Sequence, residues 1–362
     1  MPDRFITTSE AAQRLGVKPA TLYAYVSRGL LRSVRQPGQN ESLYDRGEVE
    51  NLALAPSSAR RASHGLLRFR SVVSAVSSQD ATHLYYRGRP ISRVCGTMSF
   101  AEAAAFVLES ADVPPMLPVT EQSLTLARAV PIARRLPVAI ALIGADDPMR
   151  ADTTPEALIA RSLGLIAVAG ELYGDLIDLD DELTQALLVA LIDNGLAAST
   201  TAARVAASAR AGWYDVVSAG LAAMGGRLHG GAPLAARLLL REVMTGSDPR
   251  EVVARAVETH GNVPGFGHVV YRDDDPRAKV LTRVVRRSGR ADDELAAIAA
   301  LRKAARAPMN VDAMSAVICQ ALSLPDRAGE ALFQLARTVG ITAHAIEEYA
   351  EQPLRWRART DG

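Results

Sequence analysis

Histidine, aspartate and glycine occur together in short segments whose composition suits proton transfer beside a carbonyl. Six histidines in 362 residues are few, and two of them lie in segments with two nearby glycines: His229 in RLHGGA and His268 in VPGFGHVVYRDDDPR. Glycine lacks a Cβ, so the backbone around it can approach a ligand closely. Asp312, in PMNVDAMS, is the lone acid near the start of an otherwise apolar helix. Two imidazoles and one carboxylate can abstract a proton and donate hydrogen bonds to the enol that forms.

Arginines in or near these segments indicate a substrate with two or three carboxylates. Arg277 ends the DDDPR run, Arg337 falls inside the apolar segment LARTVGITAHAIEE, and Arg355 begins the tail RWRAR. The planar guanidinium group matches the geometry of a carboxylate. Neither a metal nor a redox cofactor is needed for this chemistry. Cys95 and Cys319 share no motif typical of a metal site or a disulfide framework.

Each candidate also has a purely structural interpretation, and one segment alone does not decide between the two. His229 would then be a hydrogen-bonded core histidine, Asp312 a helix cap, and Arg337 the partner of a structural carboxylate. His344, near Arg337, is interpreted as structural. The three aspartates at 273–275 are interpreted as a solvated turn.

The elements that position these groups are expected to be nearly all helical. Apolar residues make up 48% of the chain and aromatic residues 5%, with many Ala, Leu and Arg, which is typical of a helical protein. Helices are predicted over residues 99–108, 181–191, 200–211, 233–245, 248–260, 293–305, 311–322 and 329–348. Pro155 is expected at the start of a further helix. Residues 84–91 favour a short strand or turn, and no strand alternation of useful length appears.

Residues 5–55 predict a small winged helix-turn-helix module. An N-cap at Thr7–Glu10, a break near Gly16, a second helix from Ala20 and a Pro-Gly hairpin at 35–45 follow in order, with a further helix over 45–52. The pattern SEAAQRLGV…TLYAYVSRGLL…SLYDRGEVENL resembles a mercury-regulator-type module. The candidate DNA-contacting residues are Lys18, Thr21, Tyr23 and Arg28.

Charge is distributed unevenly along the chain. Residues 1–70 carry 11 Lys and Arg against 6 Asp and Glu, whereas the whole chain has a net charge of +1. A basic first segment suggests an anionic partner such as DNA. The alternative is that the module serves only packing or oligomerisation. Residues 56–70, including His64, are expected to form a linker. No long apolar run or signal-peptide core occurs, so a soluble cytoplasmic protein is expected.

The segments LHGGA, VPGFGHVVYRDDDPRA, NVD and LARTVGITAHAIEE, in that order, resemble the signature segments of the citrate synthase family. The resemblance runs from about Leu84 to Gly362. It implies an all-α homodimer that joins acetyl-CoA to oxaloacetate, or propionyl-CoA in a 2-methylcitrate synthase. It also implies a large helical domain in two parts, residues 71–232 and 331–362, and a small helical domain, residues 233–330, that closes over the substrate.

The resemblance implies a role for each candidate residue. His229 would donate a hydrogen bond to the thioester oxygen, Asp312 would remove the methyl proton, and His268 would polarise the oxaloacetate carbonyl. Arg277 and Arg337 would bind the carboxylates. The tail arginine, Arg355, would reach into the site of the neighbouring subunit, which makes the dimer necessary for activity. The coenzyme A thioester is a substrate, and no cofactor is implied.

Several positions differ from the family pattern. Asn194 stands where the family has a histidine that helps to hold oxaloacetate, and Ala197 where it has an asparagine. Asparagine can donate a hydrogen bond but cannot carry a positive charge, which costs about 1.5–3 kcal/mol, or roughly 10- to 150-fold in affinity. The other differences are Val269, Ile341 and Trp356.

The unchanged catalytic residues and the altered binding residues together predict a working enzyme with a changed preference or a weaker affinity. The alternative from another class of function is a DNA-binding regulator. Its synthase-like body would then sense a carboxylate or an acyl-CoA and turn over poorly.

Overall fold

The structure is a computed structural model that describes residues 5–27, 31, 33–35, 42–46, 49, 72–110 and 113–356. The chain divides into two compact units, Met1–Val73 and Ser74–Gly362. Some predictions lie outside the described residues: Arg28, most of the helix at 45–52, the hairpin tip, and the linker with His64. For Tyr23 the backbone alone is described.

The N-terminal unit is a helix-turn-helix with a small antiparallel sheet. Its elements are β1 (Phe5–Thr7), α1 (Thr8–Leu15), α2 (Pro19–Ser27), β2 (Ser33–Arg35) and β3 (Ser42–Asp45), with the strands in the order β1-β3-β2. Thr7 and Glu10 form a capping box at the start of α1, and Gly16 ends it at φ 63°. The predicted helix-turn-helix and the pairing of β2 with β3 are therefore confirmed, while β1 is an additional strand.

The second unit is nearly all helical, as predicted. Its elements are β4 (Ser77–Gln79), β5 (Leu84–Tyr86), β6 (Arg89–Pro90), η1 (Ile91–Arg93), α5 (Phe100–Leu108), α6 (Glu121–Arg128), α7 (Ile132–Asp146), α8 (Pro155–Tyr173), α9 (Glu182–Leu191), α10 (Ala198–Ser208), α11 (Trp213–Met224), α12 (Ala232–Met244), α13 (Pro249–His260), α14 (Pro276–Ser288), α15 (Asp292–Ala305), α16 (Val311–Ala321) and α17 (Ala328–Tyr349). The strands β4, β5 and β6 form one short antiparallel sheet.

The helices predicted from the sequence correspond to α5, α9, α10, α12, α13, α15, α16 and α17, and Pro155 is the first residue of α8. The sequence pattern does not predict α6, α7, α11 or α14. Two of these have clear reasons: α7 contains Pro137, and α14 is mostly polar, with Val280, Leu281 and Val284 buried on one face. Tertiary packing of that face stabilises α14 where local pattern is weak.

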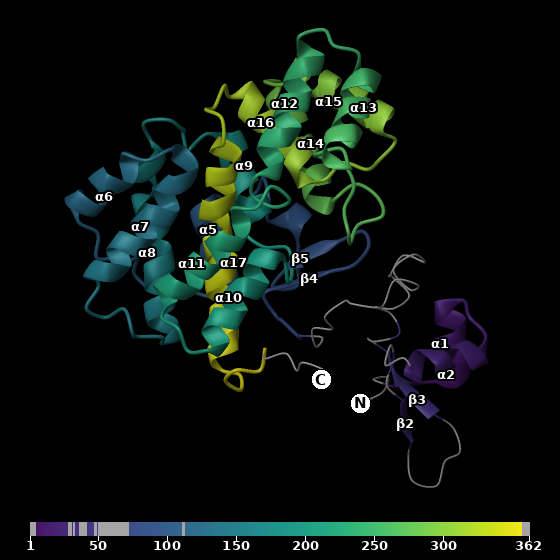
Figure 1. Cartoon of the computed structure of the whole chain (residues 1–362). Helices are drawn as coiled ribbons and strands as arrows, with labels where there is room; N and C mark the ends of the chain where they lie inside the picture. The colour runs from purple at the N-terminus through teal and green to yellow at the C-terminus, as the bar shows by residue number, and fades with distance from the viewer. Residues whose placement is uncertain are drawn as a thin grey trace. The chain divides into compact units, whose positions relative to one another are not determined.

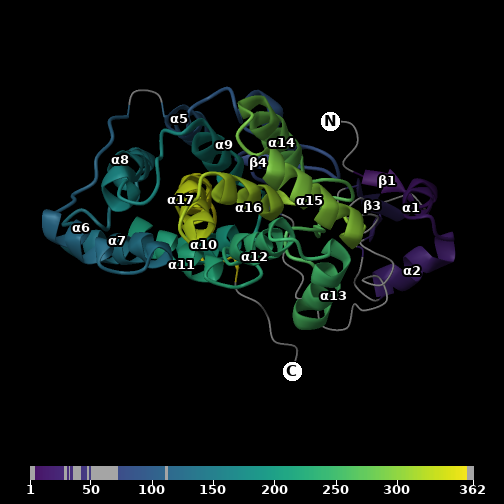
Figure 2. The same ribbon diagram turned by 90° about the horizontal axis from the view of Figure 1, so that it is seen from above.

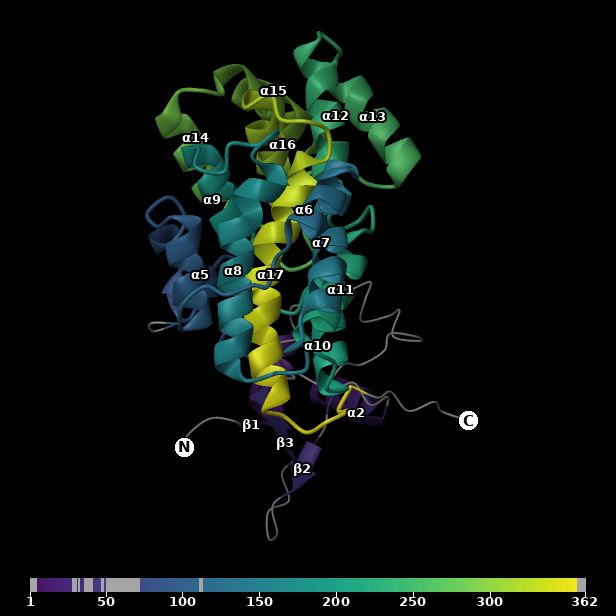
Figure 3. The ribbon, with the colours of Figure 1, turned by 90° about the vertical axis from the view of Figure 1, so that its left-hand side faces the viewer.

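Helix α17 is the central element of this unit. Nearly all of its residues from Ala328 to Ala345 are buried. The helices α7, α8, α10 and α11 surround it, and α12–α16 gather around one end (Figures 1 and 3). Seen from above, α17 lies between α6–α8 on one side and α12–α16 on the other (Figure 2). Helices that are far apart in the sequence therefore pack against the same element, α17.

Within the described ranges, none of the helices combines the length and the apolar character that a membrane crossing needs.

Candidate active site

The loop that carries His268 is bonded to the segment that carries Asp312. Gly265 and Gly267 adopt φ values of 87° and 80°, which side chains with a Cβ rarely adopt. The N–H of Asn310 donates to the carbonyl of Gly265 (3.0 Å), and its Nδ2 donates to the carbonyl of Gly267 (3.0 Å). The two glycines therefore make the tight turn that the sequence predicts, and the turn fixes His268 beside the start of α16.

Asp275 joins the first turns of α14 and α16. Its carboxylate caps α14 through the N–H of Arg277 (2.9 Å) and accepts from Nε (3.0 Å) and Nη2 (2.6 Å) of the same arginine. It also accepts from the N–H of Val311 (3.3 Å). Burial opposes its charge, but Arg277 holds the pKa of Asp275 below its usual value. Asp275 thus positions Arg277 and the helix of Asp312 together.

The interpretation of the three aspartates as a solvated turn is wrong for two of them. Asp275 is fully buried, and the half-buried Asp274 accepts the N–H of Met309 (2.8 Å) and pairs with Arg302 (2.8 Å). The signal for Asp275 was present in the sequence. An aspartate directly before a proline is a common start of a helix, with the aspartate as N-cap and the proline at the first position.

Arg337 is fully buried in α17 with unused hydrogen-bonding capacity. Its Nε donates to the carbonyl of Leu191 (3.2 Å), and the guanidinium lies 5.0 Å from the ring centroid of Phe333. Its Nη1 has no partner, and among the described residues no carboxylate lies within ion-pair distance. Arg337 therefore forms no ion pair with a structural carboxylate among the described residues, although the charge of the buried Asp193 acts on it. A buried guanidinium nitrogen without a partner is suited to an anionic ligand.

His229 lies in the turn between α11 and α12 and is half-buried. Its Nε2 is 2.9 Å from the hydroxyl of Ser199, and its ring meets Phe333 edge-on at 5.1 Å. Burial, with the charges of Arg337 and Arg277, lowers the pKa of His229 to about 3. The imidazole is therefore neutral at physiological pH.

His268 is also neutral, and its tautomer follows from its contacts. Its Nδ1 accepts the backbone N–H of Val270 (3.0 Å), with that of Tyr271 at 3.4 Å. The ring lies against Tyr271, with 4.5 Å between centroids. Burial, with the charge of Arg277, lowers the pKa of His268 to about 4. Because Nδ1 is an acceptor, the ring proton is on Nε2.

Asp312 lies in the first turn of α16 but does not cap it. The N-cap is Asn310, whose side-chain oxygen accepts the N–H of Asp312 (3.0 Å), so the interpretation of Asp312 as a cap is wrong. Burial raises the pKa of Asp312 to about 7, with Arg277 opposing and Asp275 assisting. A carboxyl group with a pKa near neutrality can act as a general base at physiological pH.

Arg277 connects these groups electrostatically. Its positive charge contributes to the pKa of His229, His268 and Asp312, and it also lowers that of Arg337. Such contributions fall off with distance, so these side chains are gathered around Arg277. The structure therefore brings together five of the residues selected from the sequence.

Asn194 also belongs to this region. It is buried between α9 and α10, and its Oδ1 accepts a hydrogen bond from the hydroxyl of Tyr271 (2.7 Å). The same hydroxyl lies 3.1 Å from Oε1 of Gln79, on β4. Sequence reasoning missed Tyr271 and Gln79, because a tyrosine and a glutamine in isolation carry no catalytic signal.

Arg355 is not brought to these residues within one chain. It forms a two-pronged ion pair with Glu348, at 2.6 Å from both Nε and Nη2, and Trp356 Nε1 donates to the same carboxylate (2.8 Å). From Arg337 to Tyr349 the helix advances about 18 Å at 1.5 Å per residue.

His344 is fully buried, with Nε2 3.1 Å from Asp193 Oδ2 and Nδ1 2.6 Å from Arg204 Nη1. These contacts agree with the structural interpretation of this histidine.

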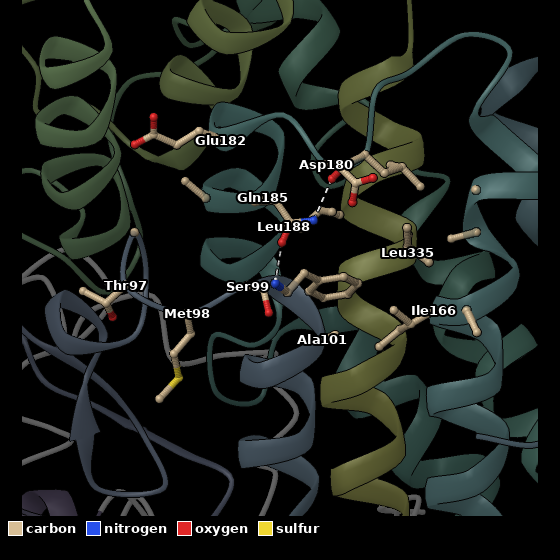
Figure 4. A pocket seen from close by; sticks show the side chains of 17 residues that line it. Thr97, Met98, Ser99, Ala101, Ile166, Asp180, Glu182, Gln185, Leu188 and Leu335 are labelled. Carbon is tan, nitrogen blue, oxygen red and sulfur yellow. Dashed lines mark hydrogen bonds between the residues drawn. The ribbon is translucent and has the colours of Figure 1, made fainter. Parts of the chain in front are cut away.

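Two cavities lie near but outside this cluster. One of about 720 Å³ is formed by α5, α8 and α9, where Gln185 bridges two backbone groups (Figure 4), and none of the candidate residues lines it. The other, also about 720 Å³, adjoins the segment that follows His268. Its basic lining residues are Arg272, Lys279, Arg302, Lys303 and Arg306. We call it the cationic cavity.

Among the described residues, no group of three or more His, Cys, Asp and Glu side chains is placed to hold a metal ion. In the N-terminal unit, Lys18 is exposed directly before α2, and Thr21 is half-buried in its first turn.

Comparison with known families agrees with both units. Residues 170–359 match the family model described as citrate synthase, C-terminal domain. Residues 7–40 match the model described as MerR family regulatory protein.

Curated relatives and solved structures agree with the first of these matches. The citrate synthase of Haloferax volcanii is 31% identical over 258 residues, which cover 67% of this chain and 66% of the relative. A Mycobacterium tuberculosis relative, also named as a citrate synthase, is 36% identical over 178 residues, 46% of this chain and 47% of the relative. The chain thus matches about half the length of this relative.

The fold resembles that of two solved citrate synthases. The Thermotoga maritima structure has a TM-score of 0.67 and 24% identity, covering 83% of this chain and 95% of that one. The Thermoplasma acidophilum structure, a ternary complex with carboxymethyl coenzyme A and oxaloacetate, has a TM-score of 0.66 and 20% identity at the same coverage. Since the family model covers more than half of its residues, the chain belongs to the citrate synthase family.

Proposed function

We propose that the chain condenses a short acyl-CoA thioester with oxaloacetate, with acetyl-CoA giving citrate and free coenzyme A. One observation carries the proposal: the charge of the buried Arg277 acts on two neutral imidazoles and on a carboxyl group with a pKa of about 7. This combination supplies a base, two neutral hydrogen-bond donors and a positive charge in one place.

In the first step Asp312 removes a proton from the carbon next to the thioester. The Ser199 hydroxyl lies 2.9 Å from Nε2 of His229. When this hydroxyl is the donor, the ring proton is on Nδ1. That N–H donates to the thioester oxygen as negative charge develops there. A neutral donor suits this role, because the enol it stabilises must remain reactive enough to attack.

In the second step the enol carbon attacks the keto carbon of oxaloacetate. His268 polarises the keto oxygen with its Nε2–H and transfers that proton to it as the new C–C bond forms. The proton that Asp312 removed in the first step then replaces the one that His268 lost. The backbone N–H of Val270 holds the ring in this orientation. Water then hydrolyses the resulting thioester, which releases the thiol of coenzyme A.

Arg277 and Arg337 are placed to bind the carboxylates of oxaloacetate. The unpartnered Nη1 of Arg337 supports this assignment, since a carboxylate oxygen would satisfy it. Asn194 adds a neutral amide. The cationic cavity supports binding of a coenzyme A thioester, because its five basic side chains outnumber the two aspartates at 273 and 274 and suit the phosphates of that molecule. Val269, which is 98% exposed, contributes no charge there.

We further propose that the active form is a homodimer in which Arg355 completes the site of the partner. Its distance from the other residues within one chain favours a role in trans. The helices α12–α16 would form the small domain that closes over the substrates.

The proposal is tested by mixing purified protein with oxaloacetate and either acetyl-CoA or propionyl-CoA and following free thiol. Thiol release above that of an Asp312→Ala control is expected. Equal rates for protein and control would refute the proposal. A higher kcat/KM with propionyl-CoA would identify the alternative, a 2-methylcitrate synthase.

A second function, DNA binding by the N-terminal unit, is favoured by the match of residues 7–40 to the MerR family and by the exposed Lys18 before α2. In helix-turn-helix proteins the second helix enters the major groove. The synthase-like unit would then sense a carboxylate or an acyl-CoA. Retarded migration of promoter DNA that weakens steeply with salt would support this function, and unchanged migration at low salt would refute it.

A further inference from the structure

We propose that Tyr271 and Gln79 determine specificity at the oxaloacetate subsite by fixing the amide of Asn194. The ligand chemistry is a carboxylate of a 2-oxo dicarboxylate, bound by a neutral amide N–H. The inference rests on the proposed function for the identity of the ligand.

Three segments meet at the hydroxyl of Tyr271. The tyrosine follows His268 in the loop before α14, Asn194 lies between α9 and α10, and Gln79 lies on β4. The hydroxyl oxygen is 2.7 Å from Asn194 Oδ1 and 3.1 Å from Gln79 Oε1. Tyr271 is only 2% exposed, so this contact is shielded from solvent.

A tyrosine hydroxyl has one proton and cannot donate to two amide oxygens at once. The shorter contact, to Asn194, takes that proton. Gln79 must then be the donor to the phenol oxygen. A 180° rotation of its amide exchanges Oε1 and Nε2, so that Nε2 donates to this oxygen while the shape of the side chain is unchanged. The result is a directed chain of hydrogen bonds from Gln79 through Tyr271 to Asn194.

This chain sets the direction in which Asn194 presents its donors. With Oδ1 held by Tyr271, Nδ2 points away from the tyrosine, and it has no protein partner among the described residues. The charge of Arg277 acts on Tyr271, so the proposed carboxylate-binding arginine is a close neighbour. A carboxylate that contacts Nδ2 would therefore find the Asn194 amide already fixed in orientation.

Gln79 is itself held in place by the chain next to Asn194. Gly195 adopts φ 62°, and a Cβ there would lie 2.9 Å from the end of the Gln79 amide that faces away from Tyr271. The glycine thus leaves room for the glutamine against the backbone. This close fit ties β4 to the segment that carries Asn194, and it identifies a site residue far from the sequence motifs.

The test compares four full-length proteins: the unchanged chain, Tyr271→Phe, Gln79→Leu and Tyr349→Phe. The last is a matched control, since the Tyr349 hydroxyl donates to the carbonyl of Ala211 (2.6 Å) away from the site. Oxaloacetate binding is measured by titration calorimetry, and KM for both substrates by thiol release. Thermal melting verifies that each variant is folded.

We expect Tyr271→Phe to weaken oxaloacetate binding about 5- to 10-fold, as for the loss of one hydrogen bond. Gln79→Leu should weaken it about 2- to 5-fold. The KM for the acyl-CoA should stay within about twofold in both variants, and Tyr349→Phe should change neither quantity. A purely structural role would instead alter both KM values together.

Unchanged oxaloacetate affinity in both site variants would overturn the inference, as would an equal loss in the Tyr349→Phe control. Binding of oxaloacetate by the unchanged chain without release of thiol would refute the proposed reaction, and the comparison of oxaloacetate affinities among the variants would still test this inference. If the unchanged chain binds no oxaloacetate at several millimolar, both are overturned.

Discussion

Arg204 donates a hydrogen bond of 2.6 Å from Nη1 to Nδ1 of His344, and both side chains are buried. A guanidinium has only donors, so Nδ1 must accept and the ring proton lies on Nε2, which faces Asp193 at 3.1 Å. Burial opposes a charge on His344, but Asp193 and Glu347 outweigh it and raise the pKa of this histidine above its usual value. The contact with Arg204 fits only the neutral ring. The network thus connects the interior near Asn194 with the C-terminal end of α17.

Replacing Arg204 with Met should destabilise the protein strongly. Arg204 donates to Glu348 (2.9 Å) and Glu347 (2.8 Å), and Glu348 is fully buried. Removing one partner of a buried ion pair costs about 3–5 kcal/mol. The loss here should fall at the lower end of this range, because Glu348 keeps its ion pair with Arg355. The free energy of unfolding in urea measures this loss.

The matched control is Arg128→Met, which breaks an exposed ion pair with Glu121 (2.7 Å). An exposed pair contributes about 0–1 kcal/mol, so this variant should remain close to the unchanged protein. Equal losses in the two variants would show that the buried network has no special role.

Replacing Asp312 with Asn should abolish thiol release and stabilise the protein at high pH. The pKa of Asp312 is raised from 3.8 to about 7 in the folded chain. The folded chain therefore favours the protonated carboxyl group. This group contributes its full stabilisation below pH 3.8, and the stabilisation is lost as pH rises through about 7. Relative to the unchanged chain, the melting temperature of Asp312→Asn should rise progressively between pH 4 and pH 7.

In the unchanged enzyme, the rate should increase with pH through about 7 as Asp312 ionises. The two histidines are not expected to cause this change, since their pKa values are about 3 and 4. A rate that is flat between pH 6 and pH 8 would contradict the assignment of Asp312 as the base.

The sequence predicts the candidate side chains better than the contacts that hold them. His229, His268 and Asp312 stand out because glycines or an apolar helix surround them. Sequence alone misplaces Asp275 because a run of acids is usually solvated, whereas its burial depends on α16, which begins 36 positions later. Non-local contacts of this kind have no signature in a single segment.

Helix prediction fails for a related physical reason. The segment of α14 carries many arginines, so its average composition is polar, and only its packed face is apolar. Gln79 was missed because a short strand places it beside Tyr271, which lies 192 positions away. The helix-turn-helix was predicted well because caps and glycine turns are local signals.

Replacing Asn194 with His should strengthen oxaloacetate binding. A protonated imidazole adds a charge-assisted hydrogen bond to a carboxylate, which contributes about 1.5–3 kcal/mol. The bound dicarboxylate offsets the charge of Arg277, which otherwise favours a neutral imidazole. We therefore expect the KM for oxaloacetate to fall about tenfold or more at pH 6 and less at pH 8, where the histidine is neutral. An Asn194→Gln variant, which keeps the amide, controls for size. An equal gain in that variant would exclude the charge as its cause.

Replacing Lys18 with Ala should weaken DNA binding without affecting catalysis. Lys18 is exposed directly before α2, where a cation can contact a phosphate. Losing one phosphate contact reduces the slope of log affinity against log salt by about 1. Fluorescence anisotropy at several salt concentrations measures the slope, and thiol release should be unchanged. An identical slope for the variant would exclude Lys18 from the interface.

The Arg355→Ala protein should be inactive alone. It should regain activity in a dimer with a subunit that carries a different defect. Within one chain Arg355 contacts Glu348 at the far end of α17, so a role in catalysis requires a second subunit. When inactive Arg355→Ala and inactive Asp312→Ala proteins are mixed and allowed to exchange subunits, half of the dimers combine both. Each mixed dimer has one intact site if Arg355 acts in trans, so about a quarter of the original activity should return. If Arg355 acts in cis, every site in the mixture lacks one residue and no activity returns.

Mixing Arg355→Ala with Arg337→Ala, which also lacks a proposed carboxylate contact, should give the same quarter of the activity. This result would show that recovery does not depend on the particular defect in the partner.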